Sequence, residues 1–98
     1  MPDSLARPDY PTEQARHIME ELVPEWQHQF LQKNAKYRKV RSLGARGVFP
    51  DINRKVGILE ARVWDGDTHL PTEESTDEVI MDLIGHLFLM LHMRNQGE

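Results

Sequence analysis

The segment from residue 75 to residue 93 constrains the fold more than any other part of the chain. It opens with Ser75-Thr76-Asp77-Glu78, a capping-box pattern in which the Ser75 hydroxyl and the Glu78 carboxylate can each accept a bond from a free backbone amide. From Val79 to Met93 most residues are apolar, and on a helical wheel they cover more than half of the circumference. A helix this apolar is buried on more than one side, so it is expected either centrally in a bundle or against another subunit.

The N-terminal part of the chain predicts an arm followed by helix. Residues 1–11 contain three prolines and little apolar content, which is typical of an extended arm. Thr12 can cap a helix over residues 13–23, whose apolar positions follow helical spacing. Pro24 then either begins a second helix, running to about residue 39, or kinks one long helix.

A loop and a further helix are expected in the middle of the chain. Gly44 and Gly47 break the periodicity, so residues 41–50 are predicted to be a loop, with Pro50 opening the next helix. That helix is expected to end near residue 65, before the stop at Gly66 and a polar loop to residue 74. Its apolar residues form one narrow stripe, spaced 4, 3 and 4: Ile52, Val56, Leu59 and Val63.

Taken together, these patterns predict an all-α fold, a small bundle of three to four helices. Residues 12–98 are expected to form a single helical domain, because 98 residues is the length of one domain. A domain of this size buries only about two-thirds of its unfolded surface. Completion of the core by oligomerisation is therefore expected.

Composition excludes several functional classes. The chain has no Cys, so disulfide frameworks and Cys-based zinc sites are ruled out. No apolar run reaches the length of a membrane span, and the N-terminus does not resemble a signal peptide, so a cytoplasmic location is expected.

The charges of the chain are unevenly placed. Net charge is −4, yet residues 26–50 contain no acid and hold half of the 12 basic residues. This pattern argues against general nucleic-acid binding and favours a compact anionic ligand or an acidic protein partner. A solvated basic turn is the plainer alternative.

One polar stripe crosses the last helix. Glu78, Asp82 and His86 recur at every fourth position, and an ionised Asp on an apolar helix needs a partner. Glu78 and Asp82 could present carboxylate oxygens to one Mg²⁺. The structural alternatives are that Glu78 only completes the capping box, that Asp82 pairs with Lys55 or an Arg, and that His86 is a satisfied core histidine.

A third acid could join this pair. Glu60 lies at the shoulder of the apolar stripe on the 51–65 helix, and it would complete a three-carboxylate cluster if it faced the last helix. Helical bundles build metal sites from acids on facing helices. An exposed Glu60 beside Arg62 or Trp64 is the alternative.

The basic segment contains residues suited to a nucleotide. Asn34 and Tyr37 share a face with Phe30, and an amide and a phenol beside an aromatic ring could clamp a base. They could equally close the end of a helix. Lys55, together with Arg62 on the shoulder opposite Glu60, could meet phosphate oxygens or simply solvate that face.

Three blocks of sequence resemble one family. They are Phe30-Leu31-Gln32-Lys33-Asn34-Ala35-Lys36-Tyr37, the 51–64 helix with Lys55 and Glu60, and Glu73 to Glu78 leading into Asp82-Leu83-Ile84-Gly85-His86. In order and spacing they resemble the all-α nucleoside triphosphate pyrophosphohydrolases of the MazG-like superfamily, and most of all its short phage and bacterial nucleotide modification associated domains.

The resemblance implies dimers or tetramers, and Mg²⁺ held by carboxylates on facing helices, which with an activated water cleaves a nucleotide between its α and β phosphates. Carried over by position, Glu60, Glu78 and Asp82 are the expected metal-binding and catalytic acids. The residues expected to bind the substrate are Lys33, Asn34, Tyr37, Arg41, Lys55 and His86.

The sequence departs from the family on the middle helix. Active members place two acids about one turn apart there, whereas Glu60 has Val56 one turn before it and Trp64 one turn after it. Two functions therefore stay open. One is a Mg²⁺-dependent nucleotide pyrophosphohydrolase. The other is a non-catalytic helical module that binds a nucleotide, or a host protein through its basic segment.

Overall fold

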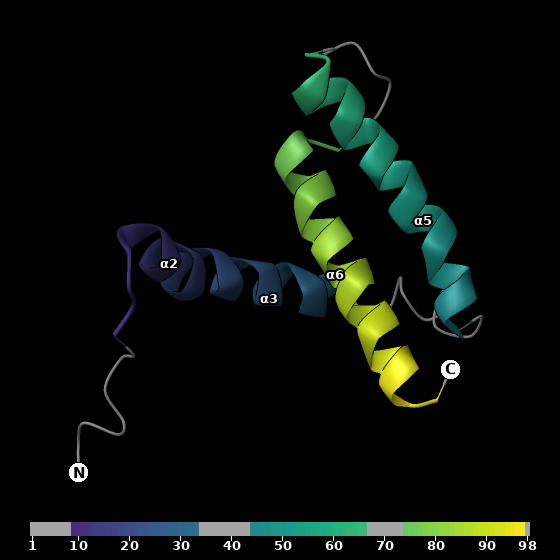
Figure 1. The fold of residues 1–98 in the computed structure, drawn as a ribbon, viewed down its shortest axis with the longest axis horizontal. Coiled ribbons are helices and arrows are strands. Elements are labelled where there is room, and N and C mark those ends of the chain that lie inside the picture. Colours follow the sequence, from purple (N-terminus) through teal and green to yellow (C-terminus); the bar gives the residue numbers. More distant parts are fainter. Residues whose placement is uncertain (1–8, 34–43, 67–73, 98) are drawn as a thin grey trace.

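The computed structural model describes residues 9–33, 44–66 and 74–97. In this part of the chain every regular element is a helix and no strand occurs, so the predicted all-α class is confirmed. The antiparallel helices α5 (Gly44–Leu59) and α6 (Thr76–Asn95) lie side by side, and an N-terminal helical arm extends away from them, with its C-terminal end against α6 (Figure 1).

The N-terminal arm consists of α2 (Glu13–His17), a π-helical segment η1 (Ile18–Leu22) and α3 (Val23–Lys33), in one unbroken helical run. Thr12 caps it as predicted, with its hydroxyl accepting a bond from the Ala15 amide at 3.1 Å. The wider π turn comes directly before Pro24, where the Val23 amide bonds to Ile18 O. This placement is consistent with the missing Pro24 amide, because a proline inside a helix leaves one carbonyl without its donor.

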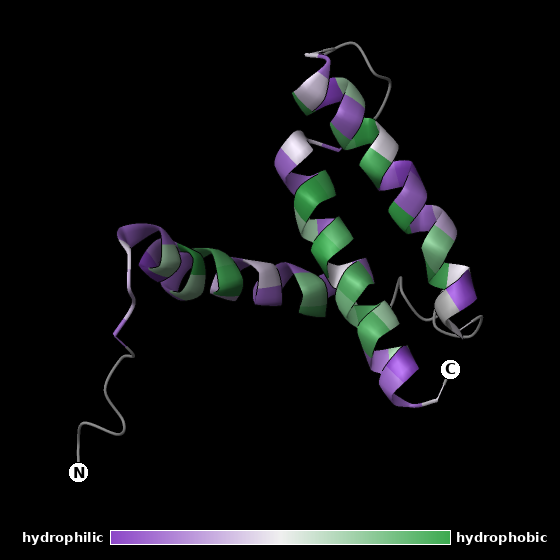
Figure 2. Cartoon of the chain, viewed as in Figure 1, coloured by the Kyte–Doolittle hydropathy of each residue, from purple (hydrophilic) through white to green (hydrophobic). Residues whose placement is uncertain are grey.

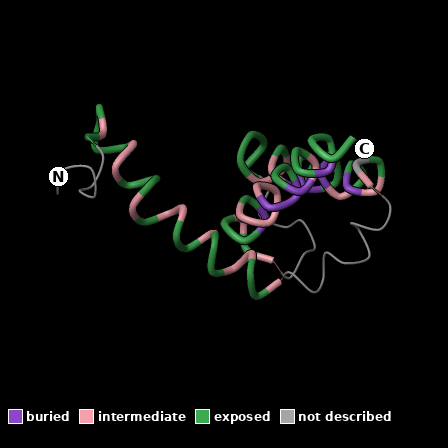
Figure 3. The backbone as a smooth tube through the Cα atoms, turned by 90° about the horizontal axis from the view of Figure 1, so that it is seen from below, coloured by how far each residue is buried: buried purple, intermediate pink, exposed green. Residues whose placement is uncertain are grey.

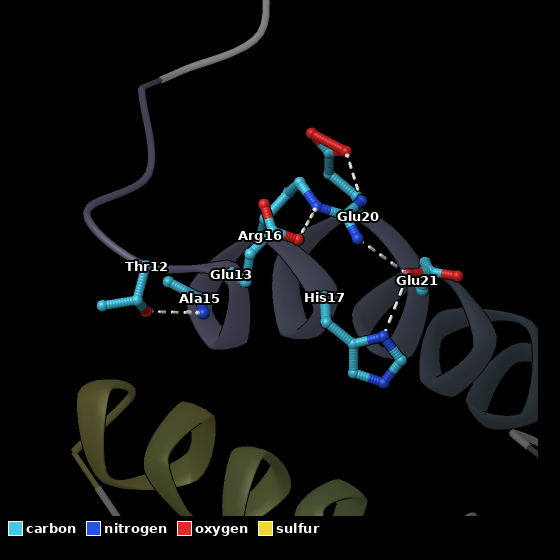
Figure 4. Close-up of polar contacts among 7 residues, drawn as sticks. All are labelled: Thr12, Glu13, Ala15, Arg16, His17, Glu20 and Glu21. Carbon is cyan, nitrogen blue, oxygen red and sulfur yellow. Dashed lines mark hydrogen bonds and ion pairs between the residues drawn. The ribbon is translucent and has the colours of Figure 1, made fainter.

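Charged side chains hold the exposed start of the arm together (Figure 4). Arg16 bonds Glu13 at 3.0 Å and Glu20 at 3.4 Å, and His17 contacts Glu21 at 2.9 Å. The hydrogen bond to Glu13 raises the pKa of Arg16, and the hydrogen bond from His17 lowers the pKa of Glu21. Such pairs one turn apart support a solvent-exposed helix but contribute little stability each.

The core lies between α5 and α6. No residue of the arm is buried, and the buried part of the described chain is confined to the two long helices (Figure 3). Leu83 and Met90 pack against a cluster of three buried residues, Val48, Ile52 and Met93. Further buried side chains line the same seam: Ile58, Val79 and Leu89.

Helix α5 begins earlier than the sequence predicted. The expected loop over residues 41–50 is wrong for its described part, because α5 starts at Gly44 and contains Pro50. Val48 lies one turn before Ile52, and both are buried, so burial of this turn offsets the loss of a hydrogen bond at Pro50. Arg46, whose carbonyl loses the Pro50 donor, is exposed to water.

The apolar stripe predicted on this helix is also wrong in part. Ile52 is buried, but Val56 is 48% exposed and Val63 is 67% exposed. The side that faces α6 instead carries Lys55, which is only 1% exposed. The helix is therefore turned so that a cation lies inside and two valines lie outside.

The ends of the last two helices agree with prediction. A π-helical segment η3 (Glu60–Trp64) continues α5 and stops before Gly66, whose φ of 72° suits a residue without a side chain. At the start of α6 the Ser75 hydroxyl accepts from the Glu78 amide at 3.1 Å, and Glu78 Oε1 accepts from the Ser75 amide at 3.4 Å. The predicted capping box is thus confirmed.

Replacing Ser75 with Ala should lower the free energy of unfolding by about 1 kcal/mol, because one amide at the start of α6 loses its acceptor. Urea denaturation followed by circular dichroism measures the change. Ser75→Thr keeps the hydroxyl and should retain most of the stability. Equal midpoints for the Ala variant and the native chain would show that the capping box contributes nothing.

Candidate functional site

A charged contact lies at the centre of the α5–α6 seam. Lys55 Nζ is 2.7 Å from Asp82 Oδ2 and 3.6 Å from Glu74 Oε2. The Asp82 side chain is 12% exposed, so both members of the closer pair are largely removed from water. Burial of a single charge there would be costly, and each group makes the burial of the other tolerable.

A second polar contact lies one turn away on both helices. His86 is buried, and its Nδ1 lies 2.8 Å from Asp82 O. Because a carbonyl oxygen only accepts, Nδ1 carries the proton in this contact. His86 Nε2 lies 3.6 Å from Asp51 Oδ2, an ion pair only when the ring is protonated. His86 is therefore a satisfied core histidine, the structural alternative that the sequence left open.

Arg62 closes the same seam near the start of α6. Its Nη1 donates to Glu74 O at 2.9 Å and to Thr76 Oγ1 at 3.4 Å. Asp51, Lys55 and Arg62 lie one or two turns apart along α5 and η3, and each contacts a partner on α6 or just before it. We call these contacts the polar seam. They lock the register of the two helices.

The structure does not gather the three predicted metal-binding acids. Asp82 contacts Lys55 in the polar seam, and Glu78 is exposed at the capping box. Glu60 is exposed on another side of the hairpin, in an apolar groove that Trp64 also lines. Within residues 9–33, 44–66 and 74–97, no group of three acidic or histidine side chains could hold a metal ion. The three acids thus lie in three different surroundings of the described structure.

The predicted substrate-binding residues are separated in the same way. Lys55 and His86 are buried in the polar seam, and Lys33 is half-buried at the end of α3. Asn34, Tyr37 and Arg41 lie outside the described residues. Of the residues expected to contact a nucleotide, only Lys33 and Asp82 line one depression in the described structure.

That depression adjoins a wider one between α3 and α6, and we call the two together the α3–α6 groove. Gln29 and Met81 line both depressions. One end is a narrow notch that is additionally lined by Trp26, Phe30, Lys33 and Asp82. The wider end is acidic and is additionally lined by Leu22, Glu25, Ser75, Asp77, Glu78 and Ile80.

Trp26 fixes the arm to α6 at the notch. Its ring lies 5.2 Å from Phe30 and 5.1 Å from Phe88, distances typical of tilted aromatic pairs. Its Nε1 is buried and has no hydrogen-bond partner among the described residues. A buried indole N–H usually finds an acceptor, so this donor lacks the partner that such a group normally has.

Sequence reasoning placed Trp26 in a buried apolar stripe and gave no role to Glu25 or Gln29. No spacing rule links α3 to α6, because the contact depends on how the arm crosses the hairpin. The one signal in the sequence was Trp26 itself, since a buried Trp needs an acceptor for its N–H.

Neither the protein-family models, nor the curated proteins, nor the solved structures with which the chain was compared give a match. Among the described helices, none combines the length and the apolarity that crossing a membrane requires.

Replacing Lys55 with Met should destabilise the chain by about 3–5 kcal/mol, because it leaves the Asp82 charge buried without its cation. Thermal and urea unfolding measure the loss. The double variant Lys55→Met/Asp82→Leu should recover most of it, since both charges are then gone.

The matched control is Arg46→Met, which removes an exposed cation from the same helix. Its midpoint should stay close to that of the native chain. A Lys55→Met variant as stable as the Arg46→Met variant would contradict the buried pair.

Proposed function

We propose that this chain binds a phosphorylated nucleotide in the α3–α6 groove without hydrolysing it. The observation that carries the proposal is that one notch is lined by the cation Lys33 and by Trp26, whose buried indole N–H has no partner among the described residues. The resemblance to nucleoside triphosphate pyrophosphohydrolases over residues 26–93 supports the same class of ligand.

The chemistry of the groove suits the parts of a nucleotide. The Lys33 ammonium is a strong donor to phosphate oxygens. The Gln29 amide and the Trp26 N–H can bond the edge of a base or a sugar hydroxyl, and Met81 offers an apolar wall. The site is therefore a mixture of apolar walls and a few placed polar groups, as small-molecule sites usually are.

The acidic end of the groove directs the ligand. Glu25, Asp77 and Glu78 repel phosphate, so the phosphates belong at the Lys33 end. Mg²⁺ commonly binds through one or two carboxylates together with substrate phosphates and water. A cation arriving with the nucleotide is thus compatible with the groove, although the side chains alone do not form a cage for it.

We propose binding without hydrolysis because the three candidate acids lie in different places. Asp82 is held by a buried lysine, Glu78 contributes to a helix cap, and Glu60 is exposed in a different groove. In one chain these carboxylates do not meet around a common point. This separation supports binding without hydrolysis.

Thermal unfolding with nucleoside mono-, di- and triphosphates, with and without Mg²⁺, tests binding. A ligand at 100 times its Kd should stabilise the native state by about 2.7 kcal/mol, which raises the midpoint by several degrees. Lys33→Gln should reduce the rise, and Trp26→Phe, which keeps a ring but removes the N–H, should also reduce it. Arg46→Gln, a control on an exposed cation of α5, should leave it unchanged.

A midpoint that no nucleotide shifts would remove the proposed ligand and favour the protein-interaction alternative. An assay for released pyrophosphate distinguishes binding from turnover. Release that disappears in Glu60→Gln or Glu78→Gln, both at exposed positions, would contradict the non-catalytic proposal and favour the pyrophosphohydrolase.

A further inference from the structure

One face of α6 is apolar, and the described parts of α5 and the arm leave most of it exposed. Helix α5 contacts α6 on the side of Val79, and the arm contacts it on the side of Phe88. At about 100° per residue, a third stripe lies between them, roughly 80–140° from Val79. We call it the outer stripe. It consists of Ile80, Ile84, Leu87 and Leu91.

The outer stripe is exposed over most of its length. Ile80 is 38% exposed, Leu87 is 48% exposed and Leu91 is 53% exposed. Hydrophobic residues run along most of α6 (Figure 2), and the sequence predicted that this helix is buried either centrally in a bundle or against another subunit. The spacing of the stripe, 4, 3 and 4, is the heptad-like spacing of helices that pack lengthwise against each other.

The apolar surface continues from α6 onto α5 and η3. Ile80 shares a groove with Val56 and Val63, and that groove is also lined by Trp64, which is 85% exposed. Single exposed apolar residues are ordinary, but a contiguous patch of them marks an interaction site. The hairpin therefore presents one broad apolar side to the outside.

Charges at the two ends of the outer stripe indicate its occupant. Asp77 lies three residues before Ile80, and Arg94 lies three residues after Leu91, so both extend the same stripe. Both are exposed. When two copies of α6 lie antiparallel, the acid at the start of one stripe faces the base at the end of the other, so the charge pattern is self-complementary.

We propose that a second copy of this chain covers the outer stripe, with the two α6 helices antiparallel about a two-fold axis between Ile84 and Leu87. Ile80 of one copy then packs on Leu91 of the other, and Ile84 packs on Leu87. Asp77 of each copy meets Arg94 of the other at both ends of the interface. The two α5–α6 hairpins become a four-helix bundle.

The outer stripe shares Ile80 with the wide end of the α3–α6 groove but shares no residue with the notch, so the assembly is tested separately from nucleotide binding at Lys33. It also accounts for the exposed apolar residues of the hairpin, which a solitary chain would leave in water at a cost of roughly 25 cal/mol per Å².

Cysteine cross-linking tests the register directly, since the chain has no Cys. Full-length Ile80→Cys and Leu91→Cys proteins are prepared separately, then mixed and mildly oxidised. The mixture should yield a disulfide-linked dimer on non-reducing gels. Each variant alone should not yield this dimer. In the proposed register, position 80 of one copy lies opposite position 91 of the other, so the two copies of position 80 are 11 residues, or about 16 Å, apart along the helix. A disulfide cannot span that distance.

Leu31→Cys, at an exposed apolar position of the arm, serves as the matched control and should not cross-link with Ile80→Cys. Light scattering of the native chain should give twice the mass of one chain or a multiple of it. A monomer, or cross-linking of Ile80→Cys with itself as readily as with Leu91→Cys, would overturn the proposal. The second result would indicate parallel helices.

Discussion

The contact between Lys55 and Asp82 determines how the two long helices face each other. A lysine placed inside a helical hairpin is costly unless a carboxylate meets it, and the pair at 2.7 Å satisfies that requirement. Once Lys55 points toward α6, the regular turn of the helix forces Val56 and Val63 outward. The buried polar seam and the exposed apolar side of the hairpin are thus two consequences of one rotation of α5. The first fixes the register, and the second creates a surface for a partner.

The N-terminal arm is held in place differently from the two long helices. It has no buried residue, and a helical run of this length is marginal in water without tertiary contacts. Trp26 provides its main anchorage by packing between Phe30 and Phe88. Trp26 also lines the proposed ligand notch together with Lys33, and its indole N–H has no acceptor among the described residues, so the anchorage of the arm and the notch share one residue.

The sequence predicted the helix caps and helix ends correctly where the interacting residues are close together in the chain. The Thr12 cap, the capping box at Ser75 and Glu78 and the stop at Gly66 were all predicted, because each depends on neighbouring residues. The rotation of α5 was not predicted from periodicity, which favours a stripe of Ile52, Val56 and Val63. The pairing of Asp82 with Lys55 was one of the alternatives that the sequence left open, and the structure contains that pair. The same limit explains why Glu60, Glu78 and Asp82 looked like one metal site, although the structure holds them in three different settings.

Amine-specific labelling of the native chain, read out by mass spectrometry, tests the orientation of α5 most directly. If Lys55 lies in the polar seam, it should be acylated far more slowly than the half-buried Lys33, and it should become reactive when the chain is unfolded in urea. Asp82→Asn should speed its labelling in the native state, because the neutral amide holds the ammonium less firmly. Labelling of Lys55 as fast as that of Lys33 in the native chain would mean that α5 turns its cation outward, and both the polar seam and the outer apolar side would then be lost.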